Sequence, residues 1–210
     1  MIDKELFFSY LDELYPDAHC ELNYTKDYEL LIAVMLSAQT TDKAVNLATA
    51  ILFSKYPTLS DLANAQIEDV ENCIKKIGMF KVKAKNVIGI AKKLVSDFDG
   101  KVPNNAESLL SLPGVGNKTK NCVLAELYHE PFLAVDTHVQ RISKRLKICK
   151  ENDSVEVMEK KLIKFIPRER LIKTNHQIIW FGRYFCKAIS PNCKKCKLFD
   201  FCGEKSRHLQ

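Results

Sequence analysis

The stretch Leu112-Pro-Gly-Val-Gly-Asn-Lys-Thr119 lies between two short segments whose apolar residues recur at helical spacing. Pro113 ends the first segment as a helix, because its ring clashes with a preceding carbonyl and it has no N–H to donate. Gly114 and Gly116 permit positive φ and let another molecule approach the bare backbone closely. The pattern therefore predicts a helix, a tight glycine hairpin and a second helix over about residues 106–128.

The hairpin also predicts an anion site next to a nucleophile. The amides of Gly114, Val115 and Gly116, with the N-terminus of the second helix, form a nest suited to a phosphate. Lys118 lies in the first turn of that helix, where the positive end of the helix dipole and partial burial would favour its neutral amine. Asp136 follows at the start of a further helix. A glycine turn that happens to carry a surface lysine is the simpler interpretation, so the hypothesis depends on a second signal.

The second signal is a group of four cysteines separated by six, two and five residues: Cys186, Cys193, Cys196 and Cys202. Thiolate sulfur suits soft metals, either one Zn²⁺ or an iron–sulfur cluster. Only one close Cys-x2-Cys pair is present, and the longer arms on either side favour a larger cluster over zinc, with disulfides as the third interpretation. The remaining cysteines, at 20, 73, 122 and 149, fit core or incidental thiols better than ligands.

The 210 residues suffice for one large domain or two small ones. Charge is distributed unevenly along them. The net charge is −6 over residues 1–29, +2 over residues 30–130 and +10 over residues 131–210. This asymmetry indicates a polyanionic partner, with nucleic acid the first candidate and a solvated basic face the alternative. No stretch approaches the ~20 apolar residues that span a bilayer, and the start lacks the pattern of a signal peptide. We therefore expect no membrane association, a cytoplasmic location and reduced or metal-bound cysteines.

Apolar residues recur at helical spacing along nearly the whole chain, without a convincing strand pattern, which predicts an all-α protein. A helix that we expect Asp27 to cap is apolar on most sides and should therefore be central. The clearest apolar stripe runs from Ala84 to Phe98. Asp153, with a glutamate three residues later, resembles a capping box. Pro131, where the charge balance changes, is the predicted domain boundary.

Together these motifs resemble the endonuclease III family of the helix-hairpin-helix superfamily, which are bifunctional DNA glycosylases and abasic-site lyases. The resemblance extends from Glu21-Leu-Asn23 through Leu30-Leu-Ile-Ala-Val-Met-Leu-Ser-Ala-Gln39, the hairpin and Ala134-Val-Asp-Thr-His138 to the four cysteines. It implies a 4Fe–4S cluster held by those cysteines. It also implies a six-helix barrel domain over residues 20–130 and an iron–sulfur cluster domain formed by residues 1–19 and 131–210, with DNA in the cleft between them.

The resemblance also assigns roles to individual residues. Lys118 and Asp136 match the catalytic lysine and aspartate. Gln39 matches the residue that fills the gap left by a flipped nucleotide, and Met79 matches a leucine wedge on the opposite side. This chain departs from the family pattern at Met79 and Phe80, where Leu and Tyr are common, and at Asn117, where Arg is common. Lys194 and Lys195, beside the cysteines, and the hairpin amides are the expected phosphate contacts.

The implied function is DNA base-excision repair of duplex DNA containing damaged pyrimidines or abasic sites. The enzyme would remove oxidised or ring-saturated pyrimidines and cleave the abasic site by β-elimination through a lysine Schiff base. We expect a monomer acting on the nucleoid in the bacterial cytoplasm. An adenine glycosylase of the same superfamily would lack the lysine at position 118. A non-catalytic DNA-binding or redox-sensing cluster protein would have no use for Lys118 and Asp136 together.

Overall fold

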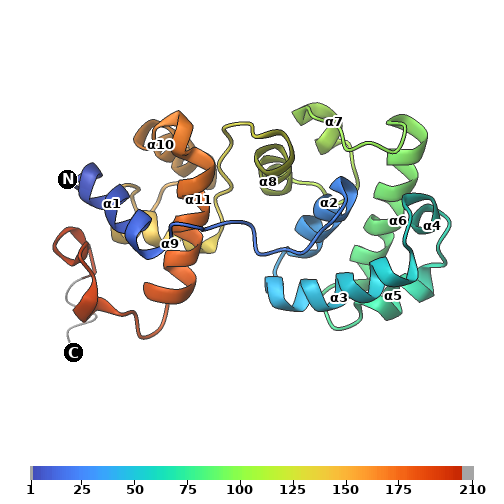
Figure 1. Cartoon of the computed structure of the whole chain (residues 1–210), viewed down its shortest axis with the longest axis horizontal. Helices are drawn as coiled ribbons and strands as arrows, with labels where there is room; N and C mark the ends of the chain where they lie inside the picture. Colours follow the sequence, from blue (N-terminus) through green and yellow to red (C-terminus); the bar gives the residue numbers. More distant parts are fainter. Residues whose placement is uncertain (1, 205–210) are drawn as a thin grey trace. The chain divides into compact units, whose positions relative to one another are not determined.

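The computed structural model describes residues 2–204, and every regular element in that range is helical (Figure 1). This confirms the all-α prediction. The chain forms two compact units, one from Met1–Cys20 and His129–Gln210 and the other from Glu21–Tyr128. Their assignment as a cluster domain and a barrel domain stays a prediction. Among the described residues, no helix combines the length and the apolar character needed to cross a bilayer.

The Glu21–Tyr128 unit is organised around α2, which packs against α3, α6 and α8. Every residue of α2 after Asp27 is buried, so the prediction of a central helix is confirmed. The helices of this unit are α2 Asp27–Leu36, α3 Asp42–Lys55, α4 Leu59–Ala63, α5 Ile67–Ile74, α6 Phe80–Asp97, α7 Ala106–Leu110 and α8 Asn117–Tyr128. The two helices on either side of the predicted hairpin, α7 and α8, are therefore present.

The start of α2 differs from the prediction. The N-cap is Lys26 rather than Asp27, which is already the first helical residue. The carboxylate of Glu29 accepts hydrogen bonds from the backbone N–H of Thr25 at 2.8 Å and of Lys26 at 3.3 Å. Glu29, at the third helical position, thus accepts from N–H groups that precede the helix. This is one half of a capping box, and it does not depend on the side chain of the N-cap residue.

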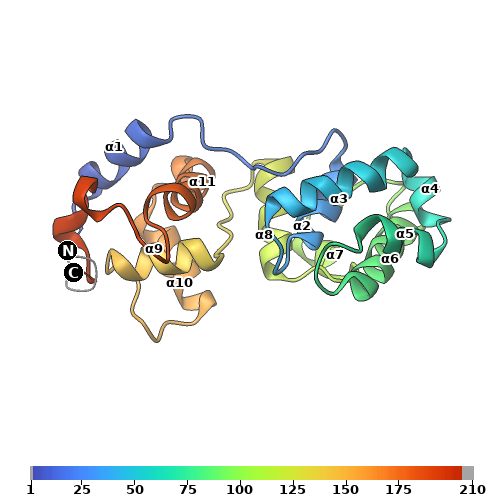
Figure 2. The ribbon, with the colours of Figure 1, turned by 90° about the horizontal axis from the view of Figure 1, so that it is seen from below.

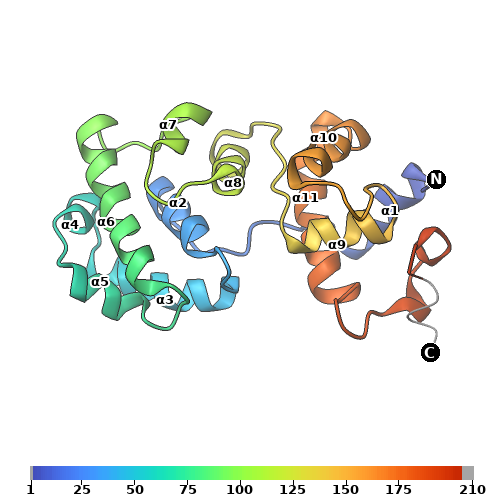
Figure 3. The same ribbon diagram turned by 180° about the vertical axis from the view of Figure 1, so that it is seen from behind.

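The long helix α6 packs against α4 and α5, beside which it lies in Figure 3. Most of its predicted stripe is buried, including Ala84, Val87, Ala91 and Leu94. Val95 is 46% exposed, because a residue directly after Leu94 is turned about 100° away from it around the helix. The buried face of α6 also includes Lys83 and Ile90, so it is turned around the helix from the predicted stripe, away from Val95.

The other unit joins the two ends of the chain. Phe7, Tyr10 and Leu11 of α1 are buried in one core with residues of α9, α10 and α11, and α1 packs directly on α11 (Figure 2). Its elements are α1 Lys4–Leu14, α9 Thr137–Arg145, α10 Val155–Phe165, the 3-10 turn η1 Arg168–Arg170, α11 Leu171–Trp180, the π-helical turn η2 Phe181–Phe185, and the 3-10 turns η3 Cys193–Lys195 and η4 Phe199–Phe201. The stretch from Arg168 to Phe185 thus consists of three consecutive helical elements of different types.

The start of α10 lies one residue later than predicted. Ser154 is the N-cap, and its hydroxyl accepts from the Val157 amide at 3.4 Å. Asp153 does not cap the helix. It accepts from the Lys150 amide at 2.7 Å and forms a 2.6 Å ion pair with Lys161. Its carboxylate therefore closes the turn before the helix instead.

Candidate active site and cysteine pocket

The glycine hairpin is held against α6. Gly114 has φ +73°, and a Cβ at this position would lie 2.4 Å from Nδ2 of Asn86. Only glycine fits there without strain or displacement of Asn86. Gly116 differs from the prediction: its φ is not positive, and a Cβ there would meet nothing within 4 Å. The backbone at Gly116 therefore borders open space that another molecule can enter.

Lys118 lies in the first turn of α8, directly after the hairpin. Its side chain is exposed, so the predicted partial burial is wrong. The helix is anchored by its neighbours instead: Thr119 is buried, and the Lys120 amide donates to the Gly116 carbonyl at 2.9 Å. The amine of Lys118 is thus presented to solvent from a rigid helix start, beside amides that have no partner within the first helical turn.

Asp136 is the N-cap of α9. One carboxylate oxygen, Oδ1, accepts from the Val139 amide at 2.8 Å, and the side chain is half-buried. The segment before it is fixed by Asn175 of α11, whose amide Oδ1 accepts from Ala134 N at 2.8 Å while Nδ2 donates to Ala134 O at 3.3 Å. Capping orients the carboxylate of Asp136 and leaves Oδ2 available for a further contact.

His138, in the first turn of α9, is enclosed by the π-helical turn η2. A Cβ on Gly182 would lie 2.9 Å from the His138 Cβ, so only glycine allows this approach. Arg141 donates to the Gly182 carbonyl at 2.7 Å and lies 3.2 Å from Nδ1 of His138. Burial lowers the pKa of His138, opposed by the nearby carboxylate of Asp136. These contacts give His138 a packing role beside Asp136.

Gln39 and Met79 are exposed and have left-handed backbones although neither is glycine, a property that Asp99 shares in the Glu21–Tyr128 unit. Gln39 has φ 54° and lies in the loop between α2 and α3, and Met79 has φ 57° and precedes α6. The Met79 side chain is 54% exposed. Such conformations are uncommon for residues with a Cβ and persist where the surroundings enforce them. Gln39 and Met79 are thus presented to solvent on constrained turns.

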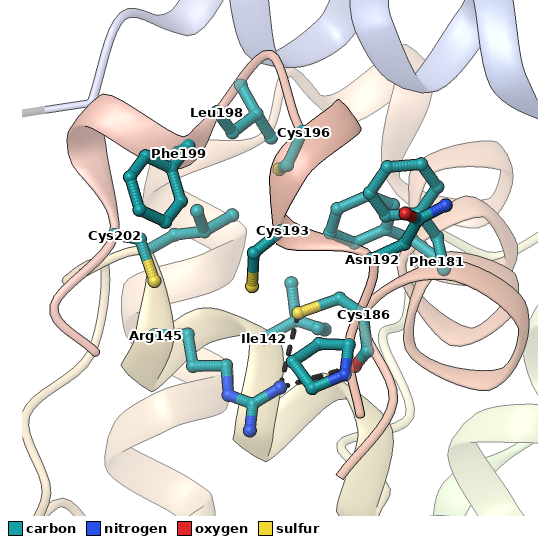
Figure 4. Close-up of a pocket in the computed structure, with 13 residues that line it drawn as sticks. Ile142, Arg145, Phe181, Cys186, Asn192, Cys193, Cys196, Leu198, Phe199 and Cys202 are labelled. Carbon is teal, nitrogen blue, oxygen red and sulfur yellow. Dashed lines mark hydrogen bonds between the residues drawn. The ribbon is translucent and has the colours of Figure 1, made fainter. Parts of the chain in front are cut away.

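The four predicted ligands line one pocket in the unit formed by the two chain ends (Figure 4): Cys186, Cys193, Cys196 and Cys202. The space between the pocket's lining atoms and the adjoining open solvent together amount to about 360 Å³, and its other walls are mostly apolar. The four thiols lie around the pocket and do not converge on one point within it. Among the described residues, no three His, Cys, Asp or Glu side chains converge closely enough to hold a single ion.

Hydrogen-bond donors face two of the sulfurs. Arg145, whose side chain is 6% exposed, donates from Nη1 to Sγ of Cys186 at 3.3 Å (Figure 4). It also forms an ion pair with Glu204 at 2.9 Å. The backbone amide of Glu204 donates to Sγ of Cys202 at 3.4 Å. Burial, together with the other three thiols, raises the pKa of Cys196 to about 11, although a backbone hydrogen bond from Leu198 opposes the shift. Hydrogen bonds donated to the sulfurs and an apolar lining are the surroundings in which proteins hold iron–sulfur clusters.

The lysines beside the pocket do not all have the same freedom. Lys194 and Lys195 are exposed on η3. Lys197 instead forms a 2.6 Å ion pair with Glu13 of α1 and lies over the ring of Tyr10. The Tyr10 hydroxyl also donates to the Lys195 carbonyl at 3.1 Å. Helix α1 therefore holds this loop in place.

Sequence reasoning missed three buried polar residues that contact the predicted ones or the residues beside them: Lys83, Asn175 and Arg145. Each has its partners far along the chain, so no local pattern names them. A signal was present for Lys83, because it occupies a place on the buried side of α6, where an apolar residue is expected. Arg145 likewise lies on the buried side of α9. A charged residue at a core position was the available clue.

Comparison with known proteins identifies the family. A model of the HhH-GPD superfamily of base excision DNA repair proteins matches residues 32–168. Endonuclease III of Bacillus subtilis (strain 168) is 44% identical over 194 residues, which are 92% of this chain and 89% of that protein. Two solved structures match all of this chain and all of their own. They are a trapped endonuclease III–DNA covalent intermediate (estranged-adenine complex), with 43% identity and a TM-score of 0.94, and a non-covalent endonuclease III–DNA complex, with 45% and 0.93. The chain therefore belongs to the endonuclease III family, within the HhH-GPD superfamily of base excision DNA repair proteins.

Proposed function

We propose that this protein is a DNA glycosylase and abasic-site lyase that removes oxidised or ring-saturated pyrimidines from duplex DNA. The observation that carries the proposal is the exposed amine of Lys118, at the start of α8 and directly after the hairpin. The two solved relatives are complexes of endonuclease III with DNA, one of them covalent, which supports duplex DNA as the partner.

The hairpin would hold a DNA phosphate through the backbone amides of Gly114, Val115 and Gly116. Val115 is only 8% exposed and its amide donates to the Leu112 carbonyl at 3.2 Å, so a phosphate would have to share that donor. The open space at Gly116 leaves room for a phosphate oxygen. Backbone amides at a helix N-terminus bind phosphate without reading sequence. Such a contact suits an enzyme that must act wherever damage occurs.

Lys118 would act as the nucleophile on a nucleotide turned out of the duplex. Its neutral amine attacks C1′ of the sugar, and the C1′–base bond breaks with its electron pair leaving on the base. The sugar ring opens to an iminium. Loss of a C2′ proton then forms a C=C bond and expels the 3′ phosphate, and water later releases Lys118. Asp136 would stabilise the positive charge that develops on the sugar, since α9 uses only one of its oxygens.

Gln39 and Met79 would stabilise the opened base stack. An amide or apolar side chain inserted between bases replaces part of the stacking lost when a nucleotide is extruded. Their exposure on constrained left-handed turns supports this role, because an inserted side chain must not collapse on contact.

The four cysteines of the pocket would hold a 4Fe–4S cluster: Cys186, Cys193, Cys196 and Cys202. The donor set fits, with four thiols around one volume and donors facing the sulfurs of Cys186 and Cys202. When bound, such a cluster supplies a cross-link between chain segments and a one-electron redox couple. The chain's own part is to orient the loop that carries Lys194 and Lys195, which would contact phosphates. On this proposal the unit formed by Met1–Cys20 and His129–Gln210 is the iron–sulfur cluster domain, and the Glu21–Tyr128 unit is the six-helix barrel domain.

The place of action follows from the substrate. The relative compared above is bacterial, and bacterial chromosomal DNA lies in the cytoplasm. We therefore propose that the protein acts there as a monomer associated with the nucleoid.

Borohydride trapping tests the nucleophile. Incubation with duplex DNA containing an abasic site, in the presence of borohydride, should give a covalent protein–DNA adduct, because the reagent reduces an iminium to a stable amine. Lys118→Gln should bind the duplex but form no adduct and no strand break, whereas Lys120→Gln should still form both. An adduct from Lys118→Gln at the wild-type rate would place the nucleophile elsewhere. Tight binding by the wild-type protein without any adduct would favour a DNA-binding module instead.

A further inference from the structure

Lys83 is a buried lysine without an acidic partner in the described part of the chain. Its side chain is 4% exposed, although it lies on the highly charged helix α6. The ammonium donates three hydrogen bonds, to Leu36 O at 2.9 Å, to Ala38 O at 2.8 Å and to the Thr40 hydroxyl at 2.9 Å. All three donors of the group are therefore used, and every acceptor belongs to the end of α2 or the loop that follows it.

The end of α2 explains why a charge is tolerated here. The last carbonyls of a helix have no partner within it, and the dipole makes that end negative. A glycine after the helix often satisfies these carbonyls, but α2 is followed by Ser37 and Ala38. Ser37 and Ala38 donate to the carbonyls of residues 33–35, and the Lys83 ammonium binds the last one, Leu36 O, from outside the helix. Burial lowers its pKa, a cost that the three acceptors and the helix end offset.

The acceptors of Lys83 lie on both sides of Gln39. Ala38 and Thr40 are the residues immediately before and after it, and Gln39 itself has φ 54°. The same lysine also contacts the second constrained turn, because its backbone amide donates to the Met79 carbonyl at 3.0 Å. One residue thus connects the two left-handed turns that present Gln39 and Met79 to solvent.

Helix α6, which carries Lys83, also supports the hairpin. Asn86 lies against Gly114, Gly89 packs on Pro113, and the Lys93 ammonium donates to the Ser111 carbonyl at 2.9 Å. At about 100° per residue, Asn86 and Lys93 lie within about 80° of Lys83 around the helix and Gly89 about 120° away, so the hairpin contacts occupy the face next to that of Lys83. Helix α6 is therefore a common support for the hairpin and both turns.

We propose that Lys83 is a positioning residue for nucleotide extrusion, which it serves by holding the Gln39 turn and the Met79 turn at a fixed separation. This inference rests on the proposed function, in which both residues enter the opened stack. A loop that is already ordered loses less conformational entropy when its side chain is inserted into DNA. Without the Lys83 hydrogen bonds, the turns would have to lose this conformational entropy when DNA binds. Recognition of an extruded nucleotide should therefore weaken, while phosphate contacts persist.

The test compares Lys83→Met with Lys92→Met. Methionine keeps much of the length of lysine and removes all three donors, and Lys92 is an exposed residue on the opposite side of α6. The readout is the ratio of Kd values for undamaged duplex and for duplex containing a tetrahydrofuran abasic analogue. Fluorescence of 2-aminopurine opposite the analogue reports the opened stack. Lys83→Met should lower the Kd ratio roughly tenfold, as expected for losing hydrogen bonds from a charged group. Lys92→Met should leave both readouts unchanged.

A double-mutant cycle with Gln39→Ala shows whether Lys83 acts through Gln39. The second substitution should cost little once either has been made, whereas fully additive losses would overturn the inference. If Lys83→Met is poorly folded by circular dichroism, Thr40→Val removes one acceptor and should lower the ratio by roughly two- to threefold.

Trapping on a single-stranded abasic oligonucleotide separates this inference from the proposed function. That substrate has no duplex stack to fill, so Lys83→Met should give as much adduct as the wild type. An unchanged Kd ratio in Lys83→Met, beside a reduced ratio in Gln39→Ala, would overturn the role of Lys83 alone. A wild-type protein that neither prefers the abasic analogue nor forms an adduct would overturn the proposed function itself.

Discussion

The side-chain amide of Asn175 pairs with both backbone polar groups of Ala134, two residues before Asp136. Asn175 is 6% exposed and Ala134 9%, so water cannot readily replace these bonds. The pairing reproduces, with one side chain, the two hydrogen bonds that a neighbouring strand would offer. It fixes the extended segment that leads to α9 and so the position from which the Asp136 carboxylate projects.

Asn175→Ala should therefore destabilise the protein and impair base excision together. Two buried backbone groups lose their partners, for which we expect a loss of about 2 kcal/mol in the free energy of unfolding. Urea unfolding measures that loss, and excision of an oxidised pyrimidine, assayed where the variant remains folded, measures the effect on Asp136. Asp136→Asn is the comparison, since it can keep the cap while removing the charge. If Asn175→Ala unfolds at the wild-type urea concentration, the amide pairing contributes nothing.

Gly114→Ala and Gly116→Ala should differ although the two glycines are two residues apart. At Gly114 the left-handed backbone alone costs about 1–2 kcal/mol for a residue with a Cβ, and the added carbon would meet Asn86. At Gly116 the methyl group meets nothing in the protein, so stability should be unchanged while DNA affinity falls, because the methyl enters the space proposed for a phosphate. Thermal unfolding and a duplex-binding titration separate the two effects. Asn86→Ala should partly restore Gly114→Ala, and equal losses of stability in both variants would contradict this account.

Iron analysis tests the pocket. Protein purified without oxygen should be brown and contain about four iron atoms per chain, as expected of a cubane cluster. Arg145→Met should keep the cluster but make it more labile to oxygen, because Cys186 loses a hydrogen bond to sulfur, and the bonds of Arg145 to the Lys187 carbonyl and the Glu204 carboxylate are also lost. The decay of visible absorbance in air is the measurement. Stoichiometric zinc and no iron would mean that the zinc interpretation of the cysteine spacing was correct.

Much of this architecture follows from local sequence, whereas the rest depends on contacts between residues that are far apart in the chain. Apolar periodicity predicts the central α2 and most of the buried face of α6, and Pro113 with Gly114 predicts the hairpin, because these signals act within a few residues. The caps of α2 and α10 were each predicted one residue away, since a capping side chain competes with equally suitable neighbours. Contacts of Lys83 with Leu36 span 47 residues, and those of Lys197 with Glu13 span 184. A local sequence pattern cannot predict contacts over such separations.

Asp12 should make the stability of the unit formed by the two chain ends sensitive to acid. Desolvation alone would raise its pKa, but hydrogen bonds from Gln177, Arg170 and Lys173 lower it to about 2. The unfolded chain therefore binds more protons between pH 4 and pH 2, so the stabilisation is complete above about pH 4 and is lost as the pH falls towards 2. Because the carboxylate is 35% exposed, we expect only about 1 kcal/mol after screening. The difference in unfolding free energy between wild type and Asp12→Asn, measured at each pH, cancels acid effects common to both; a constant difference would contradict the prediction.

The lysines of the cysteine loop should contribute unequally to the salt dependence of DNA binding. Each phosphate contact that a lysine makes steepens the slope of log K against log salt by about 0.9. Lys194 and Lys195 are exposed, whereas Lys197 is held by Glu13 and Tyr10. The double variant Lys194→Ala/Lys195→Ala should therefore flatten the slope by about 2 without loss of iron. Lys197→Ala should leave the slope unchanged and instead loosen the loop from α1, which limited proteolysis would detect. A flatter slope in Lys197→Ala, with none in the double variant, would mean that the ion pair with Glu13 opens on DNA and that Lys197 is the residue that meets the phosphate.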